Sequence, residues 1–233
     1  MSLFFCRPYN GVIDVLGNHT LTCTYGGDRT KHHNLLQDAC VHMAWAAGWR
    51  PEPEKAGLLQ ARSFTASQGN DHEGGEGLGP EARRPADVYI PRWDLGGSAA
   101  LDFAVTSGLR TNQLEQTVAD GLSSLTSYEA IKDSYKDTAA HCAREDITFV
   151  PMVAEAHSGA WGPRANKVWL RLGKALSILS EESAASEVLR VRQNLGFALH
   201  KATARAILRR SPAYTITADR EAANALLFGS QLR

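Results

Sequence analysis

The sequence lacks an excess of charge of either sign. Its 233 residues include 25 Lys and Arg against 25 Asp and Glu, so the formal net charge at pH 7 is zero. Proteins that bind nucleic acid over a broad surface are usually basic. The balance therefore argues against broad electrostatic binding and leaves only a local basic patch as a way to contact a nucleic acid.

Long apolar runs and a cysteine framework are also missing. No apolar stretch approaches the ~20 residues of a membrane-spanning helix, so we expect no membrane partner. Residues 1–11 lack the basic segment and the apolar stretch of a signal peptide, which predicts an intracellular protein. The four cysteines, Cys6, Cys23, Cys40 and Cys142, are widely scattered, as expected in a reducing compartment.

The residues that are present suffice for a folded core, because 43% of them are hydrophobic. Their periodicity predicts an α/β (α+β) fold with a mixed central sheet, flanking helices and added C-terminal helices. We expect a segment at 1–30, a core at 31–160 containing a mobile Gly-rich loop at 63–83, and a helical extension at 161–233. The predicted helices cover 33–48, 111–143, 164–180 and 183–210, and the predicted strands cover 57–59, 87–90, 99–105 and 147–154.

The stretch RPADVYIPRWDLGGSAALDFAVTS at 84–107 organises the chain. Two apolar runs flank a turn rich in Gly and Asp, which predicts a β-hairpin. Asp87 opens the first strand, and Asp102 lies among apolar neighbours in the second. Burying a carboxylate is costly unless it is paired, hydrogen-bonded or bound to a metal. The two acids could share one divalent ion, or each could be satisfied by backbone amides at a strand end.

Further acids and bases extend this pattern. Glu54 precedes the predicted edge strand, and Lys132 and Lys136 are four residues apart on a predicted helix, so we expect them to share a face. Carboxylates that hold Mg²⁺ or Mn²⁺, together with a nearby lysine, are what metal-assisted phosphodiester hydrolysis requires. The last helix is basic toward its end, which indicates either a solvated face or a phosphate-contacting one. Its relevant bases are Lys201, Arg205 and Arg209.

The N-terminal segment carries part of a zinc-binding pattern. Its candidate ligands are Cys6, His19 and Cys23. His19 and Cys23 are four residues apart, a spacing found in small zinc knuckles. Tyr9 stands where another ligand is expected, although His32 or His33 could substitute for it. The alternative is a short β-hairpin without zinc.

Taken in order, these motifs resemble the restriction-endonuclease-like PD-(D/E)xK domain of non-LTR retrotransposon polyproteins, with a degenerate N-terminal zinc knuckle. The ordered set is more specific than any single piece. The pieces are Cys6 with 16–19 and Cys23, 26–28 before 33–34, 84–88, 101–107, the lysine-bearing helix ending near Cys142, 149–151 with Glu155, 159–162 and 194–208.

The resemblance implies Mg²⁺-dependent cleavage of DNA, in the form of nicking. Asp87 and Asp102 match the two acidic positions of the family. The family's lysine two residues after the second acid is replaced by Ala104. The resemblance instead puts the lysine on the following helix, as Lys132 with Lys136 in reserve.

The resemblance has consequences outside this central motif. Glu54 matches an acid on the preceding strand and is a third candidate Mg²⁺ ligand, and Arg84 is a candidate DNA contact. DNA is the implied partner, with RNA or a reverse transcriptase of the parent element as further partners, and the implied location is nuclear. The neutral charge and Ala104 favour an alternative, in which a catalytically inactive remnant binds nucleic acid or protein. A chain of this length has no room for a reverse transcriptase domain.

Overall fold

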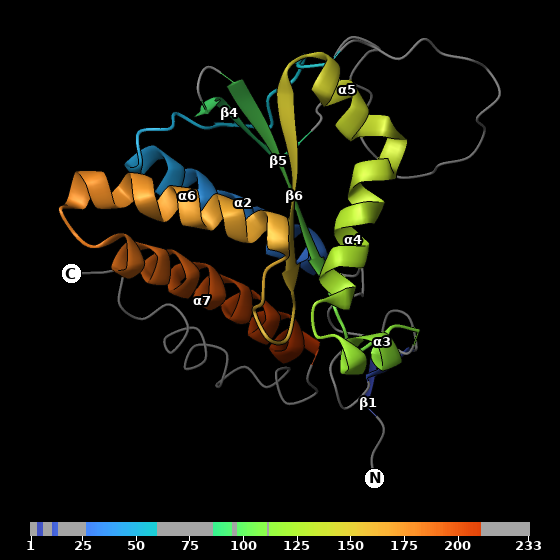
Figure 1. Cartoon of the computed structure of the whole chain (residues 1–233). Coiled ribbons are helices and arrows are strands. Elements are labelled where there is room, and N and C mark those ends of the chain that lie inside the picture. The colour runs from blue at the N-terminus through green and yellow to red at the C-terminus, as the bar shows by residue number, and fades with distance from the viewer. Residues whose placement is uncertain are drawn as a thin grey trace.

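A mixed four-stranded sheet forms the centre of the protein (Figure 1). The computed structural model describes residues 4–6, 11–13, 27–59, 86–94, 97–110 and 112–210. The strands lie in the order β3 (Glu52–Pro53), β4 (Val88–Asp94), β5 (Gly97–Thr106) and β6 (Ile147–Glu155). The first three strands are antiparallel, and β5 and β6 are parallel. The predicted fold class, with its mixed sheet and flanking helices, is confirmed at this level.

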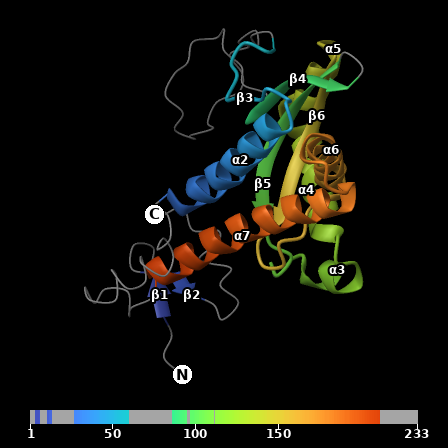
Figure 2. The same ribbon diagram turned by 90° about the vertical axis from the view of Figure 1, so that its left-hand side faces the viewer.

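Helices cover both faces of the sheet (Figures 1 and 2). One face carries α2 (Asp28–Ala46), α6 (Pro163–Ser180) and α7 (Ala184–Arg210). The other carries α4 (Ser123–Ser134) and α5 (Thr138–Arg144), and the short α3 (Leu114–Ala119) leads into α4. A separate ribbon pairs β1 (Phe4–Cys6) with β2 (Gly11–Ile13). In the described ranges, no helix is both long and apolar enough to cross a membrane.

One hydrophobic core joins the sheet to α2, α6 and α7. On α6, apolar residues recur at three and four positions, which turns one side of the helix toward the sheet. The aromatic centre of this core contains Trp161 and Trp169, whose ring centroids lie 5.0 Å apart in an edge-to-face arrangement. Phe103 of β5 lies against both indoles. The second C-terminal helix, α7, contributes Val191 and Leu195 to the same core, while α6 contacts β5 through Trp169 and Phe103.

The single long helix predicted at 111–143 is replaced by three helices. The first break, at 120–122, lies around Gly121, a residue that lowers helix stability. A second break was not predicted: Tyr135–Asp137 forms a 3₁₀ turn, in which Lys136 and Asp137 have φ angles of 52° and 53°. These left-handed conformations interrupt the helix. The expectation that Lys132 and Lys136 share one helical face is therefore wrong.

Other predicted boundaries also shift. The first long helix begins at Asp28, before the expected residue 33, and the edge strand forms at Glu52–Pro53 instead of at 57–59. Cys6 ends β1, but its expected zinc partners, His19 and Cys23, lie outside the described residues. Arg84 and the loop predicted at 63–83 also lie outside them.

Candidate functional site

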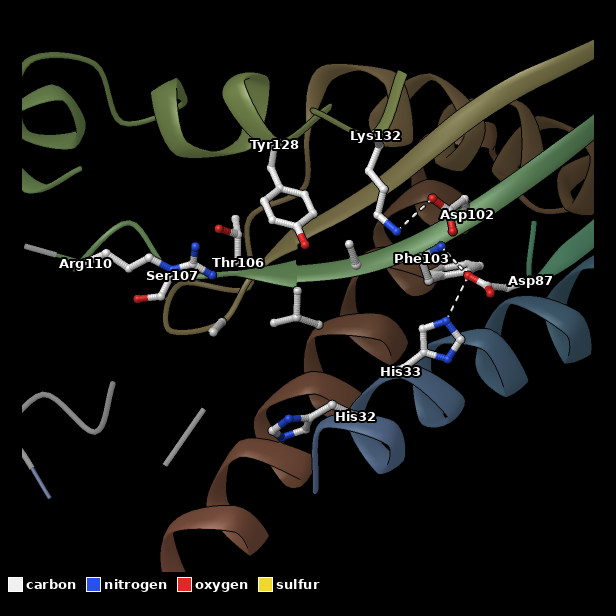
Figure 3. Close-up of a pocket in the computed structure, with 13 residues that line it drawn as sticks. His32, His33, Asp87, Asp102, Phe103, Thr106, Ser107, Arg110, Tyr128 and Lys132 are labelled. Carbon is white, nitrogen blue, oxygen red and sulfur yellow. Dashed lines mark hydrogen bonds and ion pairs between the residues drawn. The ribbon is translucent and has the colours of Figure 1, made fainter. Parts of the chain in front are cut away.

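A pocket of about 680 Å³ opens beside the C-terminal half of β5 (Figure 3). The pocket exists because β4 pairs with only the first half of β5. The paired stretch runs from Asp94 opposite Gly97 to Val88 opposite Leu101. In the described part of the chain, no strand continues that edge along residues 102–106. Side chains from α2 and α4 approach there instead. The lining residues are His32, His33, Asp87, Asp102, Phe103, Ala104, Val105, Thr106, Ser107, Arg110, Tyr128, Lys132 and Ala156.

Asp87 precedes β4 and reaches across to β5. Its amide donates a hydrogen bond to the Leu101 carbonyl over 3.0 Å. Its carboxylate Oδ2 accepts a bond from the Phe103 amide at 2.5 Å and lies 2.9 Å from His33 Nε2 (Figure 3). Asp87 thus lies against the peptide that follows Asp102. The Asp87 hydrogen bond raises the pKa of His33, although burial opposes this effect.

Asp102 and Lys132 form an ion pair inside the pocket. Lys132 Nζ lies 2.9 Å from Asp102 Oδ2, and their side chains are only 23% and 17% exposed. Burial raises the pKa of Asp102 to about 6, and the charge of Asp87 adds to this effect, while the attraction of Lys132 opposes it. Burial alone would lower the pKa of Lys132, but the Asp102 carboxylate raises it above its usual value. The pocket therefore holds a poorly solvated, closely balanced set of charges.

Contacts on the far side of α4 hold this helix in place. Glu129 Oε1 accepts a hydrogen bond from the Arg164 amide at 3.0 Å, in the first turn of α6. Asp133 forms an ion pair with the Arg164 guanidinium. A Cβ at Gly162 would lie 2.2 Å from Glu129 Oε1, so only glycine leaves room for this contact. With α4 fixed by these contacts, Lys132 is directed toward β5.

Three of the predicted catalytic residues meet in the pocket: Asp87, Asp102 and Lys132. Lys136 does not line it, and its Nζ lies 5.0 Å from the centre of the Tyr135 ring. Glu54 does not line it either. The Glu54 side chain accepts a hydrogen bond from Gln37 at 3.1 Å, while its amide donates to the Asp87 carbonyl at 2.8 Å. Glu54 is therefore tied to Asp87 through the backbone, with its carboxylate held by Gln37.

The predicted DNA-contacting residues Lys201 and Arg205 lie on α7, half-buried and exposed respectively. Arg209 belongs to the last turn of the same helix. Neither Lys201 nor Arg205 lines the pocket. In Figure 2 the C-terminal end of α7 lies on the same side of the molecule as the N-terminal end of α2, which carries His33. The basic end of α7 is therefore on the same side of the molecule as the α2 residues that line the pocket, His32 and His33.

Several lining residues were not predicted to contribute to the site. Tyr128 lies one helical turn before Lys132, so the spacing of four residues could have pointed to it. His33 belongs to a sequence motif of the resemblance, but its predicted role was that of a substitute zinc ligand, not a partner of Asp87. Arg110 gave no signal, because it follows β5 in a turn of irregular structure.

The donor set fits an oxygen-binding cation better than a zinc-type cluster. In the described ranges, no three or more His, Cys, Asp or Glu side chains gather as a metal site. Mg²⁺ commonly uses one or two carboxylates and keeps several waters, so it does not need such a cluster. The chain matches no protein-family model and no curated protein.

Proposed function

We propose that this protein is a Mg²⁺- or Mn²⁺-dependent DNA endonuclease with a PD-(D/E)xK-type site. One observation carries the proposal: Asp87, Asp102 and Lys132 line a single pocket although they come from three separate segments of the chain. The lysine was expected from the helix after the hairpin, and its Nζ lies 2.9 Å from Asp102. Two acids and one lysine are the side chains that metal-assisted phosphodiester hydrolysis requires.

Asp87 and Asp102 are the residues that would hold the metal. The carbonyl of Phe103 faces the same strand edge as its amide, which binds Asp87, and so offers a further oxygen. The charge of Asp87 raises the cost of ionising Asp102, and a divalent cation would offset this cost. When bound, Mg²⁺ would lower the pKa of a coordinated water and neutralise charge on the phosphate. Glu54 and the N-terminal zinc ligands remain predictions that this pocket does not require.

Lys132 supplies the positive charge of the site. Ala104, where the family has its lysine, has a small side chain and lines the pocket beside Asp102. The space beside β5 is therefore open to the Lys132 side chain from α4 (Figure 3). An ammonium held there can stabilise the negative charge that develops on a phosphate oxygen during hydrolysis. The distance in the chain between positions 104 and 132 does not matter, because catalysis depends on where the charge lies.

His33 is a positioning residue in this proposal. Its Nε2 contacts Asp87 Oδ2, the same oxygen that accepts the Phe103 amide bond. These two donors fix the orientation of the carboxylate and leave its other oxygen available for a cation. Partners of this kind orient metal-ligating groups and commonly affect affinity or activity 10- to 100-fold.

DNA is the proposed substrate because bases of α7 could contact its phosphates outside the pocket. Lys201 and Arg205 lie toward the end of α7, on the same side of the molecule as the N-terminal part of α2 (Figure 2). Contacts from such bases to phosphates are independent of sequence and weaken with salt. A nuclear location, and RNA or a reverse transcriptase as partners, are predictions that follow from the same resemblance.

A nicking assay on supercoiled plasmid with Mg²⁺ or Mn²⁺ tests the proposal. We expect relaxed circles from the wild-type protein and loss of nicking in Asp87→Asn, Asp102→Asn and Lys132→Met. Lys174→Met, which removes an exposed lysine on α6, is the matched control. Lys136→Met distinguishes the two predicted lysines and should retain activity. Salt-sensitive DNA binding without any cleavage would instead support the non-catalytic alternative.

A further inference from the structure

The pocket extends beyond the proposed metal site. Asp102, Ala104 and Thr106 alternate along one face of β5, and the strand ends at Thr106. Ser107 and Arg110 follow in the next turn, and Arg110 extends toward Thr106 (Figure 3). Four residues of strand span about 13 Å. Thr106 and Arg110 therefore form a second end of the pocket, separate from the acids.

Arg110 brings a positive charge to this end without a matching acid. Within the described residues it forms no ion pair, whereas Lys132 pairs with Asp102 and His33 with Asp87. Its Nε is buried and makes no hydrogen bond in the described structure. A guanidinium presents several N–H donors in a planar fork that matches phosphate. This unused donor capacity indicates an anionic ligand.

Thr106 provides an independent indication. It is only 1% exposed, and among the described groups its hydroxyl has no hydrogen-bond partner. Buried polar groups in folded proteins are nearly always hydrogen-bonded, so such a hydroxyl calls for a ligand or a water. Thr106 lines the same pocket as Arg110. Two neighbouring polar side chains therefore share unsatisfied hydrogen-bonding capacity.

Glu155 organises the backbone around this end. Its carboxylate accepts hydrogen bonds from the amides of Gly108, His157 and Ser158, at 3.2, 2.9 and 2.6 Å. These bonds tie the turn after β5 to the turn after β6. The two strands are parallel and end together, at Thr106 and Glu155. The carboxyl ends of parallel strands are a common place for ligand sites.

We propose that Arg110 and Thr106 form a subsite for a second phosphate of the nucleic-acid backbone. The Arg110 guanidinium donates to the phosphate oxygens, and the Thr106 hydroxyl completes the contact. The scissile phosphate lies at Asp87, Asp102 and Lys132, and the second lies further along the same strand. The subsite rests on the proposed function for its substrate, but its anion chemistry can be measured separately.

Calorimetric titration of the metal-free protein with inorganic phosphate tests the anion site directly. We expect Arg110→Gln to weaken phosphate binding at least tenfold and Thr106→Val to weaken it about threefold. Arg110→Lys keeps the positive charge but loses the planar set of N–H donors, so it should bind phosphate more weakly than the wild type and more tightly than Arg110→Gln. Arg144→Gln, an exposed arginine at the end of α5, is the matched control and should bind as the wild type does. Circular dichroism confirms that each variant is folded.

Steady-state nicking supplies the second measurement. If the subsite positions DNA, Arg110→Gln should raise KM about tenfold and change kcat less than threefold. Unchanged phosphate affinity in a folded Arg110→Gln protein would overturn the subsite. If the wild type binds phosphate through Arg110 but never nicks DNA, the anion site stands and the proposed nuclease function fails. If it nicks DNA and the Arg110 variants match the wild type in both measurements, only the subsite falls.

Discussion

Replacing Asp102 by asparagine should change how the stability of the protein depends on pH. The pKa of Asp102 rises from 3.8 in the unfolded chain to about 6 in the folded protein. Each pKa unit corresponds to about 1.4 kcal/mol, so ionising this carboxyl costs the folded state about 3 kcal/mol. Because the folded state binds the Asp102 proton more tightly, the protonated carboxyl adds to the free energy of unfolding. This stabilisation is lost as pH rises from about 4 to 6.

Urea denaturation in EDTA between pH 4 and 7 measures this effect. The free energy of unfolding of Asp102→Asn minus that of the wild type should rise by about 2.4 kcal/mol between pH 4 and 7. Lys132 loses its partner in the variant, which adds an offset, but a lysine titrates above this range. Glu145→Gln removes an exposed carboxylate outside the pocket and separates the pocket effect from a simple loss of charge. A difference that stays constant within about 0.5 kcal/mol would refute the reasoning.

Magnesium extends the same experiment. A cation that binds only the folded state at a hundred times its Kd adds about 2.7 kcal/mol to the free energy of unfolding. This gain should appear in the wild type and be absent in Asp102→Asn. Because a metal needs the ionised carboxylate, Mg²⁺ affinity should fall about tenfold per pH unit below pH 6. An affinity that does not change between pH 5 and 7 would argue against Asp102 as a ligand.

Three further substitutions test other parts of the structure. Lys132→Met should lower the nicking rate about 10²- to 10³-fold, because the developing charge on the phosphate loses its ammonium partner. Mg²⁺ binding should not weaken, because the substitution removes a cation that competes for Asp102. A loss of Mg²⁺ affinity in a metal titration would contradict this prediction. His33→Ala should lower kcat about tenfold and alter the acid limb of its pH profile, because Asp87 loses an orienting donor; an unchanged profile would remove His33 from the site. Trp169→Ala should lower the free energy of unfolding by about 3–5 kcal/mol in urea, since this indole is fully buried between the sheet and α6, and a loss below 1 kcal/mol would contradict the packing.

Short-range patterns in the sequence were sufficient for much of the fold. Alternation around Val88 and Ile90 indicated the hairpin, and the helical periods indicated α6 and α7 to within one residue. The two acids stood out because a carboxylate in an apolar strand needs a partner. These inferences depend on neighbours in the chain, which the sequence displays directly.

The break after α4 shows where such patterns fail. The sequence around Lys136 is compatible with a continuing helix, and its periodicity predicted a face shared with Lys132. The observed left-handed φ angles at Lys136 and Asp137 interrupt that face. Their positions depend on how α4 and α5 pack on the sheet, which a local pattern does not encode.

The sequence by itself determined the fold class, the central hairpin, and Asp87 and Asp102 as the residues to examine. Tertiary structure decided which bases meet them. Lys132 reaches Asp102 because α6 holds α4 in place through Glu129, and His33 reaches Asp87 because α2 lies beside the open edge of β5. The partners of these acids are far away in the chain and come together only through the packing of helices on the sheet. For that reason the composition of the pocket could be seen only in the folded structure.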